Sequence, residues 1–233
     1  MKRVAILQSN YLPWKGYFDL ISSVDDFVIY DSVQYTRRDW RNRNQIKTKD
    51  GLHWITVPVK VKGKYHQTIA ETELNGSDWV REHLEAIRHA YARAPAFAVV
   101  FPWFEDLLKS APQTTISALN RHTIEGICAR LGIAARLHDS ADFDLAEDRT
   151  LRLRGICEQL GATEYVSGPA AKAYMDESLF AEKGIGVRWK SYGGYPEYPQ
   201  VWPPFDHHPS IIDLLLCLGD DAPKFLHSGQ PFE

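Results

Sequence analysis

The first 31 residues constrain the fold most, because a strand, a helix and a second strand follow one another there. Val4–Leu7 is a short continuous apolar run, which is typical of a central strand buried on both faces. Apolar side chains recur at helical spacing over residues 17–21, and Phe27–Asp31 is a second apolar run that ends in a carboxylate. This order predicts a βαβ unit with a right-handed crossover, and hence a parallel sheet.

The middle of the chain has a different character. Residues 36–64 carry nine Lys or Arg against two acids, the most basic stretch of the sequence. Residues 53–61 alternate with a period near two after the turn signal at 49–51, which predicts a β-hairpin. Helical patterns follow. We therefore expect a basic β excursion over about residues 36–76 and a helical segment over about residues 77–131.

Breakers and caps divide the helical segment. Ser77 is expected to cap its first helix, and Pro95 and Pro102 to interrupt the helical pattern. A further helix from about Thr114 should end at Gly132. Later strands are expected at residues 134–137, 164–167 and 187–189, and later helices at residues 150–160, 168–175 and 210–218. The fold class predicted is α/β: one domain over residues 1–233, with a Rossmann-like parallel sheet and helices on both faces.

Composition excludes some classes of protein. At 233 residues and a net charge of −3, the chain can bury a full core but has no global basic field like that of a DNA-packaging protein. Its three cysteines stand far apart among apolar neighbours, without a CxxC pair, so we expect reduced thiols and no structural zinc. The His207–His208 pair leaves a metal site open as an alternative to a plain loop pair. The first apolar run is too short for a signal peptide or a membrane span, so we expect a cytoplasmic protein without membrane insertion.

The first strand runs into the turn Pro13–Tyr17, where a helix begins. Helix starts favour anions, and Gly16 would let a phosphate approach the main chain. The segment resembles the HxGH signature of the nucleotidylyltransferase and class I aminoacyl-tRNA synthetase superfamily, with Trp14 and Tyr17 in place of its histidines. Neither residue can be a cation, so a different mechanism is expected. The alternative is a hydrophobic turn packed under the sheet.

Further polar residues follow the second strand and a later one. Ligands collect at the carboxyl ends of parallel strands, where Asp31 and Gln34 must fall. The arginine-rich run behind them suits a nucleotide, a sugar nucleotide or an RNA backbone, and tRNA is a candidate partner through residues 37–64. A solvated cationic surface is the alternative. At Ser167–Tyr174 another strand opens through Gly168 into an expected helix start; the alternative is a simple helix start with proline at its first position.

These segments together resemble the WbqC-like protein family over nearly the whole chain. The resemblance rests on Gln8–Tyr17, on Asp31–Ile46 with its ending DWRNRNQI, on Tyr165–Tyr174 (YVSGPAAKAY), on Tyr198–Gln200 and on Ser210–Leu215. It implies a product of a bacterial surface-polysaccharide gene cluster that transfers an aminoacyl group, especially glycyl, to an amino sugar. The sequence departs from the family pattern at Asp206–His208.

We therefore predict an enzyme that forms an amide on an amino sugar or sugar nucleotide, using ATP, another nucleotide or an activated donor such as aminoacyl-tRNA. The alternatives are a non-catalytic module that binds a nucleotide, sugar nucleotide or tRNA, and a nucleotidyltransferase. The candidate catalytic residues are Asp31, Tyr17 and Lys172, and no metal is predicted. The candidate substrate-binding residues are Gln8, Asn10, Tyr11, Trp14, Lys15, Gly16, Gln34, Arg38, Trp40, Asn42, Arg43, Ser167, Gly168, Tyr174, Tyr198 and Gln200.

Overall fold

A parallel sheet forms the centre of the computed structural model, which describes residues 1–228 and 232. The sheet has the strand order β5-β2-β1-β6-β7, and all four neighbouring pairs are parallel. Its strands are β1 (Arg3–Leu7), β2 (Asp26–Ile29), β5 (Arg136–Asp139), β6 (Glu164–Ser167) and β7 (Gly186–Trp189). The chain moves outward from β1 to one edge and then returns to build the other edge. The order therefore reverses between β1 and β6.

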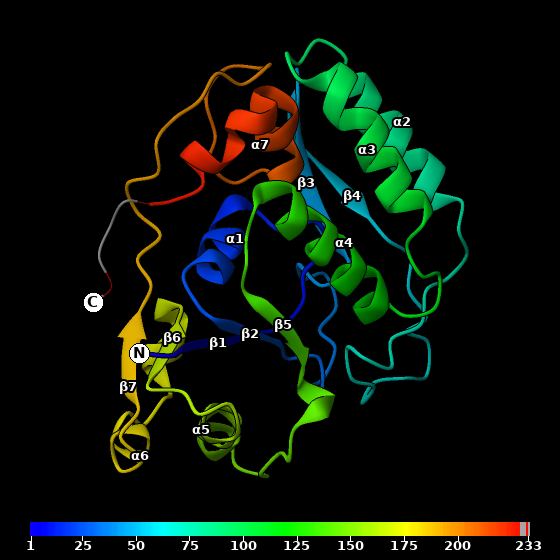
Figure 1. Cartoon of the computed structure of the whole chain (residues 1–233). Helices are drawn as coiled ribbons and strands as arrows, with labels where there is room; N and C mark the ends of the chain where they lie inside the picture. The colour runs from blue at the N-terminus through cyan, green and yellow to red at the C-terminus, as the bar shows by residue number, and fades with distance from the viewer. Residues whose placement is uncertain (229–231, 233) are drawn as a thin grey trace.

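Side chains alternate between the two faces of this sheet, and each face has its own core. Ala5, Phe27 and Val166 belong to one apolar cluster, whereas Val4 and Tyr165 belong to the other. Helices cover both faces, as predicted (Figure 1). The first face is covered by α1 (Lys15–Ser22), α4 (Ile116–Leu131) and α7 (Ile211–Leu218), and the second by α5 (Arg149–Gln159) and α6 (Ser178–Ala181).

The basic segment forms the predicted β-hairpin, of β3 (Arg43–Thr48) and β4 (Gly51–Thr56). Gly51 has a φ of 105°, a turn conformation that favours glycine. The hairpin lies beside the helical segment of α2 (Trp79–Tyr91) and α3 (Phe97–Lys109) (Figure 1). Its inner residues Ile46 and Ile55 join the core of the first sheet face. The excursion is therefore packed onto the α/β core.

Two helix expectations were wrong at their boundaries. Pro102 lies inside α3 and does not interrupt it. Its missing N–H deprives only the carbonyl of Ala98, an exposed residue, so water can replace that bond. The segment after Gly168 is a short 3₁₀ helix, η2 (Pro169–Ala173), followed by a turn. Two other 3₁₀ helices are η1 (Ser140–Asp142) and η3 (Gly219–Phe225).

The ends of α4 are as expected, whereas the expected cap at Ser77 is wrong. The Thr115 side chain accepts a bond from the backbone N–H of Ala118, and Gly132 ends α4 in the left-handed conformation. Asp78, not Ser77, precedes α2, and its side chain makes no capping bond. Among the residues that the structure describes, no helix is both long and apolar enough to cross a membrane.

A buried carboxylate on α1 holds the C-terminal part of the chain against the sheet. Asp19 is 1 % exposed and lies 2.9 Å from the ammonium of Lys190, just after β7. It also accepts hydrogen bonds from the Tyr195 hydroxyl at 2.8 Å and the Ser228 backbone N–H at 3.2 Å. Asp19 therefore joins three distant segments of the chain to α1.

Replacing Asp19 by Asn should destabilise the fold strongly. The Asp19→Asn variant leaves the buried Lys190 without its carboxylate, and such losses cost about 3–5 kcal/mol. Urea denaturation measures the change. The matched control is Asp220→Asn, which breaks the pair of a 92 % exposed side chain with Arg130 and should cost less than about 1 kcal/mol. Equal losses in the two variants would contradict this role of Asp19.

Candidate functional site

A cavity of about 490 Å³ lies at the carboxyl ends of β1 and β6, where the strand order reverses. Ile6, Leu7 and Tyr165 form part of its wall from the strands themselves, and Tyr30 contributes from the end of β2. In open parallel sheets, ligands bind at this reversal point because the loops of neighbouring strands separate there. We call this cavity the switch-point cavity.

Five predicted binding residues line the switch-point cavity. They come from three different strand ends and are Gln8, Gln34, Ser167, Gly168 and Tyr174. Lys172 is exposed and lies on η2 beside Ala171, which also lines the cavity. The structure thus brings together the ends of β1, β2 and β6, as the rule for parallel sheets predicts.

The cationic residues of this cavity were missed in the sequence. Arg149 and Arg152 line it from the first turn of α5. The guanidinium of Arg149 lies 3.5 Å from the centre of the Tyr174 ring, a stacked cation–π contact. Arg152 instead donates to the carbonyls of Ala146 and Glu147 and so holds the preceding loop. A signal was present, because a helix between two parallel strands must begin at the ligand-binding edge of the sheet.

The loop after β1 is held by Arg41, a second residue that the sequence argument passed over. Its Nη1 donates to the Ser9 carbonyl at 3.2 Å and to Oδ1 of Asn10, and its Nη2 donates to Oε1 of Gln8. Gln8 lines the switch-point cavity, whereas Asn10 lines a smaller cavity of about 170 Å³. Arg41 therefore holds one lining residue of each of two cavities, both on the same loop.

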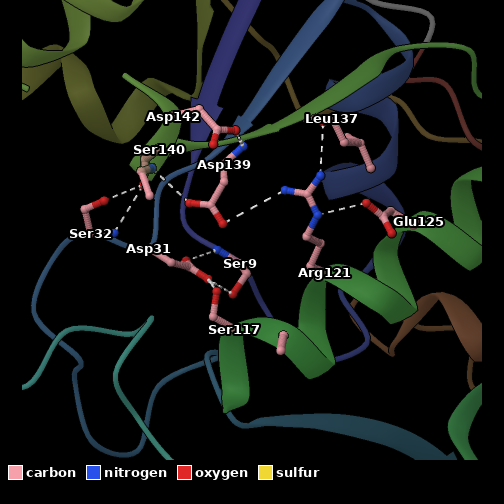
Figure 2. A network of polar contacts seen from close by, with 12 residues as sticks. Ser9, Asp31, Ser32, Ser117, Arg121, Glu125, Leu137, Asp139, Ser140 and Asp142 are labelled. Carbon is pink, nitrogen blue, oxygen red and sulfur yellow. Dashed lines mark hydrogen bonds and ion pairs between the residues drawn. The ribbon is translucent and has the colours of Figure 1, made fainter. Parts of the chain in front are cut away.

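Asp31 is fully buried, and its carboxylate bonds to other residues of the protein (Figure 2). Its carboxylate accepts bonds from the Ser9 backbone N–H at 2.8 Å, the Ser9 hydroxyl at 2.6 Å and the Ser117 hydroxyl at 2.6 Å. Burial raises the pKa of Asp31, and the bonds from Ser117 and Ser9 oppose that rise. This geometry positions the loop after β1; the catalytic role of Asp31 stays a prediction.

Tyr17, the second candidate catalytic residue, is also buried. Its hydroxyl donates to the Gln8 carbonyl at 3.2 Å. Burial raises the pKa of Tyr17 well above its ordinary value, with a further contribution from the charge of Asp31. The hydroxyl is therefore a hydrogen-bond donor at neutral pH. Its contact supports the same loop that Asp31 and Arg41 hold.

The glycine of the first turn makes room for a tryptophan. A Cβ atom placed on Gly16 would lie 2.3 Å from an atom of the Trp14 indole. The sequence argument that Gly16 leaves space for a phosphate is therefore wrong, because the indole takes that space. Trp14 also packs against the rings of Tyr192 and Tyr195, with centroids 5.6 and 5.8 Å away. The alternative of a packed aromatic turn describes this segment better.

Lys15 is buried inside an aromatic cage. Its ammonium lies 4.9 Å from the Tyr195 ring, 5.2 Å from the Tyr198 ring and 5.7 Å from the Phe205 ring. Burial lowers the pKa of Lys15 from 10.5 to about 8, and the nearby Asp213 opposes this change. The proline-bearing coil that supplies the cage is thereby attached to the start of α1.

The same coil contributes Tyr198 and Gln200 to a buried polar cluster around Asp213 of α7. The Asp213 carboxylate accepts bonds from the hydroxyls of Tyr198 at 2.7 Å and Tyr91 at 2.9 Å, and from the Gln200 amide at 2.9 Å. Lys47 of the hairpin donates to Gln200 at 2.6 Å. Burial raises the pKa of Asp213, and the bond from Tyr198 opposes the rise most. Tyr198 and Gln200 therefore join the coil to α7, and Gln200 also joins it to the hairpin.

Other predicted binding residues are bonded within the protein or lie on the hairpin. The hydroxyl of Tyr11 pairs with His83 at 2.9 Å, and the Asn42 amide donates to the Val57 carbonyl at 2.8 Å. Arg43 donates to the Arg38 carbonyl. Neither Arg38 nor Arg43 lines the switch-point cavity.

Part of the basic charge of the segment is neutralised locally. Lys60 and Lys64 both pair with Glu73 at 2.7 Å, and Lys47 is buried. Arg37, Arg38, Lys49 and Lys62 are exposed. A tRNA partner stays a prediction, and these four cations are residues through which it would act.

The histidine pair His207–His208 contacts a carboxylate and an aromatic ring. The ring of His208 lies 2.7 Å from Asp206, and that of His207 packs against Phe205 with centroids 4.6 Å apart. Within residues 1–228 and 232, no three His, Cys, Asp or Glu side chains gather so that they could hold a metal ion.

Comparisons with known proteins agree with the resemblance seen in the sequence. A model of the WbqC-like protein family matches residues 8–225. The chain belongs to the WbqC-like protein family. It is also 51 % identical over 226 residues to the uncharacterized protein Rv1507c of Mycobacterium tuberculosis. The aligned region covers 97 % of this chain and 98 % of that protein. No solved structure matches this WbqC-like protein.

Adding a methyl group to Gly16 should displace the Trp14 indole of this WbqC-like protein. The Gly16→Ala variant is expected to lose about 1–3 kcal/mol of stability, because the ring and not a flexible chain end must move. Thermal denaturation and tryptophan fluorescence measure the two effects. The matched control is Gly155→Ala in α5, where a Cβ meets no atom within 4 Å and stability should be unchanged or slightly higher. An unperturbed Gly16→Ala variant would contradict the packing of Trp14.

The buried Lys15 should make stability depend on pH. Because its pKa falls from 10.5 to about 8 on folding, only the unfolded chain binds a proton there between these pH values. Stability relative to a Lys15→Met variant should therefore rise by about 1–2 kcal/mol from pH 8 to pH 10. Urea denaturation of both proteins at each pH measures this difference. The matched control is Lys62→Met, which changes an exposed lysine. The stability difference between this variant and the wild type should be the same at pH 8 and pH 10.

Proposed function

We propose that this protein binds a nucleotide or sugar nucleotide in the switch-point cavity and forms an amide on an amino sugar. The observation that carries the proposal is the cavity itself, at the reversal of strand order, with Arg149 stacked on Tyr174 at its edge. A guanidinium held in this way suits a phosphate, and the start of α5 beside it favours negative charge. Lys172, exposed on η2, is the proposed second cation.

The amide chemistry is supported by family resemblance. With an activated ester donor such as aminoacyl-tRNA, the amine attacks the acyl carbon, the C–N bond forms and the C–O bond to the ribose breaks. The proton that the amine loses is taken up by the departing ribose hydroxyl. With a free amino acid, ATP would first convert the carboxylate to an adenylate and release pyrophosphate. The proposed acceptor is an amino sugar, either alone or linked to a nucleoside diphosphate, from bacterial surface-polysaccharide biosynthesis.

Removing Arg149 should weaken binding of the phosphate-bearing ligand. We expect Arg149→Ala to raise the Kd for ATP or for a nucleoside diphosphate amino sugar by about 10- to 100-fold, since a bond to a charged group is worth about 1.5–3 kcal/mol. Calorimetric titration measures the Kd of the variant and of the wild type. The control Arg81→Ala removes an exposed arginine that pairs with Glu85, and should leave the Kd unchanged. A loss in Arg43→Ala alone would instead assign the phosphate to the hairpin.

Turnover is tested separately. The purified protein is incubated with amino sugars and either ATP with amino acids or charged tRNA, and mass spectrometry follows AMP, pyrophosphate and new amides. An amide product supports the proposal; pyrophosphate without an amide supports a nucleotidyltransferase.

A second candidate function is a binding module without catalysis. It is favoured by the placement of Asp31 and Tyr17, which are buried and fully engaged in supporting the first loop. This alternative predicts ligand binding that depends on Arg149 but no turnover with any donor. The same two experiments separate it from the enzyme.

A further inference from the structure

The smaller cavity, of about 170 Å³, has mainly aromatic walls. It is lined by Asn10, Trp14, Trp40, Asn44 and His208, which come from the first loop, the hairpin and the late coil. Trp40 is 41 % exposed and the His208 side chain 76 % exposed, so the cavity opens to solvent. We call it the ring cavity.

Two of the rings that line the ring cavity are nearly parallel. The planes of Trp14 and His208 are within 21° of parallel, and their centroids are 6.5 Å apart. Both rings line the cavity, and their nearly parallel faces suit a flat ring better than a puckered pyranose.

These walls are held in place before any ligand binds. The Trp14 indole covers Gly16 and packs against Tyr192 and Tyr195. The backbone N–H of His208 donates to Oδ1 of Asp206 at 2.7 Å, and the ring Nδ1 of His208 lies 2.7 Å from the same oxygen. Because the rings are already ordered, little conformational entropy is lost on binding.

The third aromatic wall is supported from behind. Trp40 stacks on Trp54 with centroids 5.1 Å apart, and the Arg43 guanidinium covers Trp54 at 4.1 Å. Trp40, which precedes the hairpin, thus forms a continuous stack with Trp54 and Arg43 of the hairpin, and this stack ends at the cavity. This stack gives a structural reason for the two exposed tryptophans, Trp40 and Trp54, in the basic segment.

The polar residues of the cavity are also oriented. Arg41 can only donate, so Oδ1 of Asn10 must face it, and the amide hydrogens of Asn10 are directed elsewhere. Asn44 donates to the carbonyls of Tyr11 and Leu12 and so supports the loop. Leu12 has a φ of 42°, a strained conformation for a branched residue, and such strain is concentrated at functional sites. An amide donor beside stacked rings suits the edge of a heterocycle.

We infer that the ring cavity is a binding site for a nucleobase, held flat against Trp14 and His208. Base stacking on protein aromatic rings contributes about 1–3 kcal/mol per base. The ring cavity is separate from the switch-point cavity, since the two have no lining residue in common. Binding there requires neither Arg149 nor amide chemistry.

The test is titration of the full chain with nucleosides that carry no phosphate: adenosine, guanosine, cytidine and uridine. At least one should bind, with saturation-transfer NMR signals on its base protons. His208→Ala and Trp40→Ala should each raise its Kd about tenfold. His208→Phe, which keeps a flat ring, should stay within about threefold of the wild type. The control Tyr65→Ala removes a 73 % exposed aromatic ring elsewhere and should change nothing.

Several results would overturn the inference. One is the absence of nucleoside binding to the wild type; another is binding that is unchanged in both His208→Ala and Trp40→Ala. Binding of methyl glucoside, lost in those variants, in place of any nucleoside would assign the cavity to a sugar. Nucleoside binding should persist in Arg149→Ala. If it does while Arg149→Ala also leaves the Kd for the phosphate-bearing ligand unchanged, the ring cavity stands and the proposed function does not.

Discussion

The buried carboxylate of Asp31 is the interaction on which the arrangement of both cavities depends. It lies just beyond β2 and accepts three hydrogen bonds, two from Ser9 after β1 and one from Ser117 of α4. Burying a charge is costly, and these bonds offset that cost. Asn120 of α4 adds bonds to the Ser9 hydroxyl and to the Arg41 carbonyl. One polar cluster thus holds the sheet edge, a helix and the basic segment together.

The first turn is built from aromatic packing in place of charge. The Trp14 indole lies over Gly16, and the Lys15 ammonium is enclosed by aromatic rings of the late coil. The cations that line the switch-point cavity come from α5 and are Arg149 and Arg152. The proposed phosphate site and the inferred base site have no lining residue in common.

Much of the fold and part of the site could be predicted from local patterns. Apolar runs and helical spacing predicted the parallel sheet, and the rule for strand ends predicted that Gln8, Gln34 and Ser167 meet. Arg149 was missed because its partner Tyr174 is remote in the sequence and belongs to a turn after a different strand. The role of Gly16 was misjudged because a glycine before a helix is compatible with either an anion or a neighbouring ring.

The sequence by itself determined the element types, their order and the family, since these depend on periodicity, on breakers and on contiguous motifs. Only the tertiary structure decided which polar side chains are buried and which face a cavity. The physical reason is that burial and partner choice arise from contacts between remote segments, such as Asp31 with Ser117 or Trp14 with His208. Residue type alone does not distinguish a lysine enclosed by aromatic rings from one that is available to a ligand.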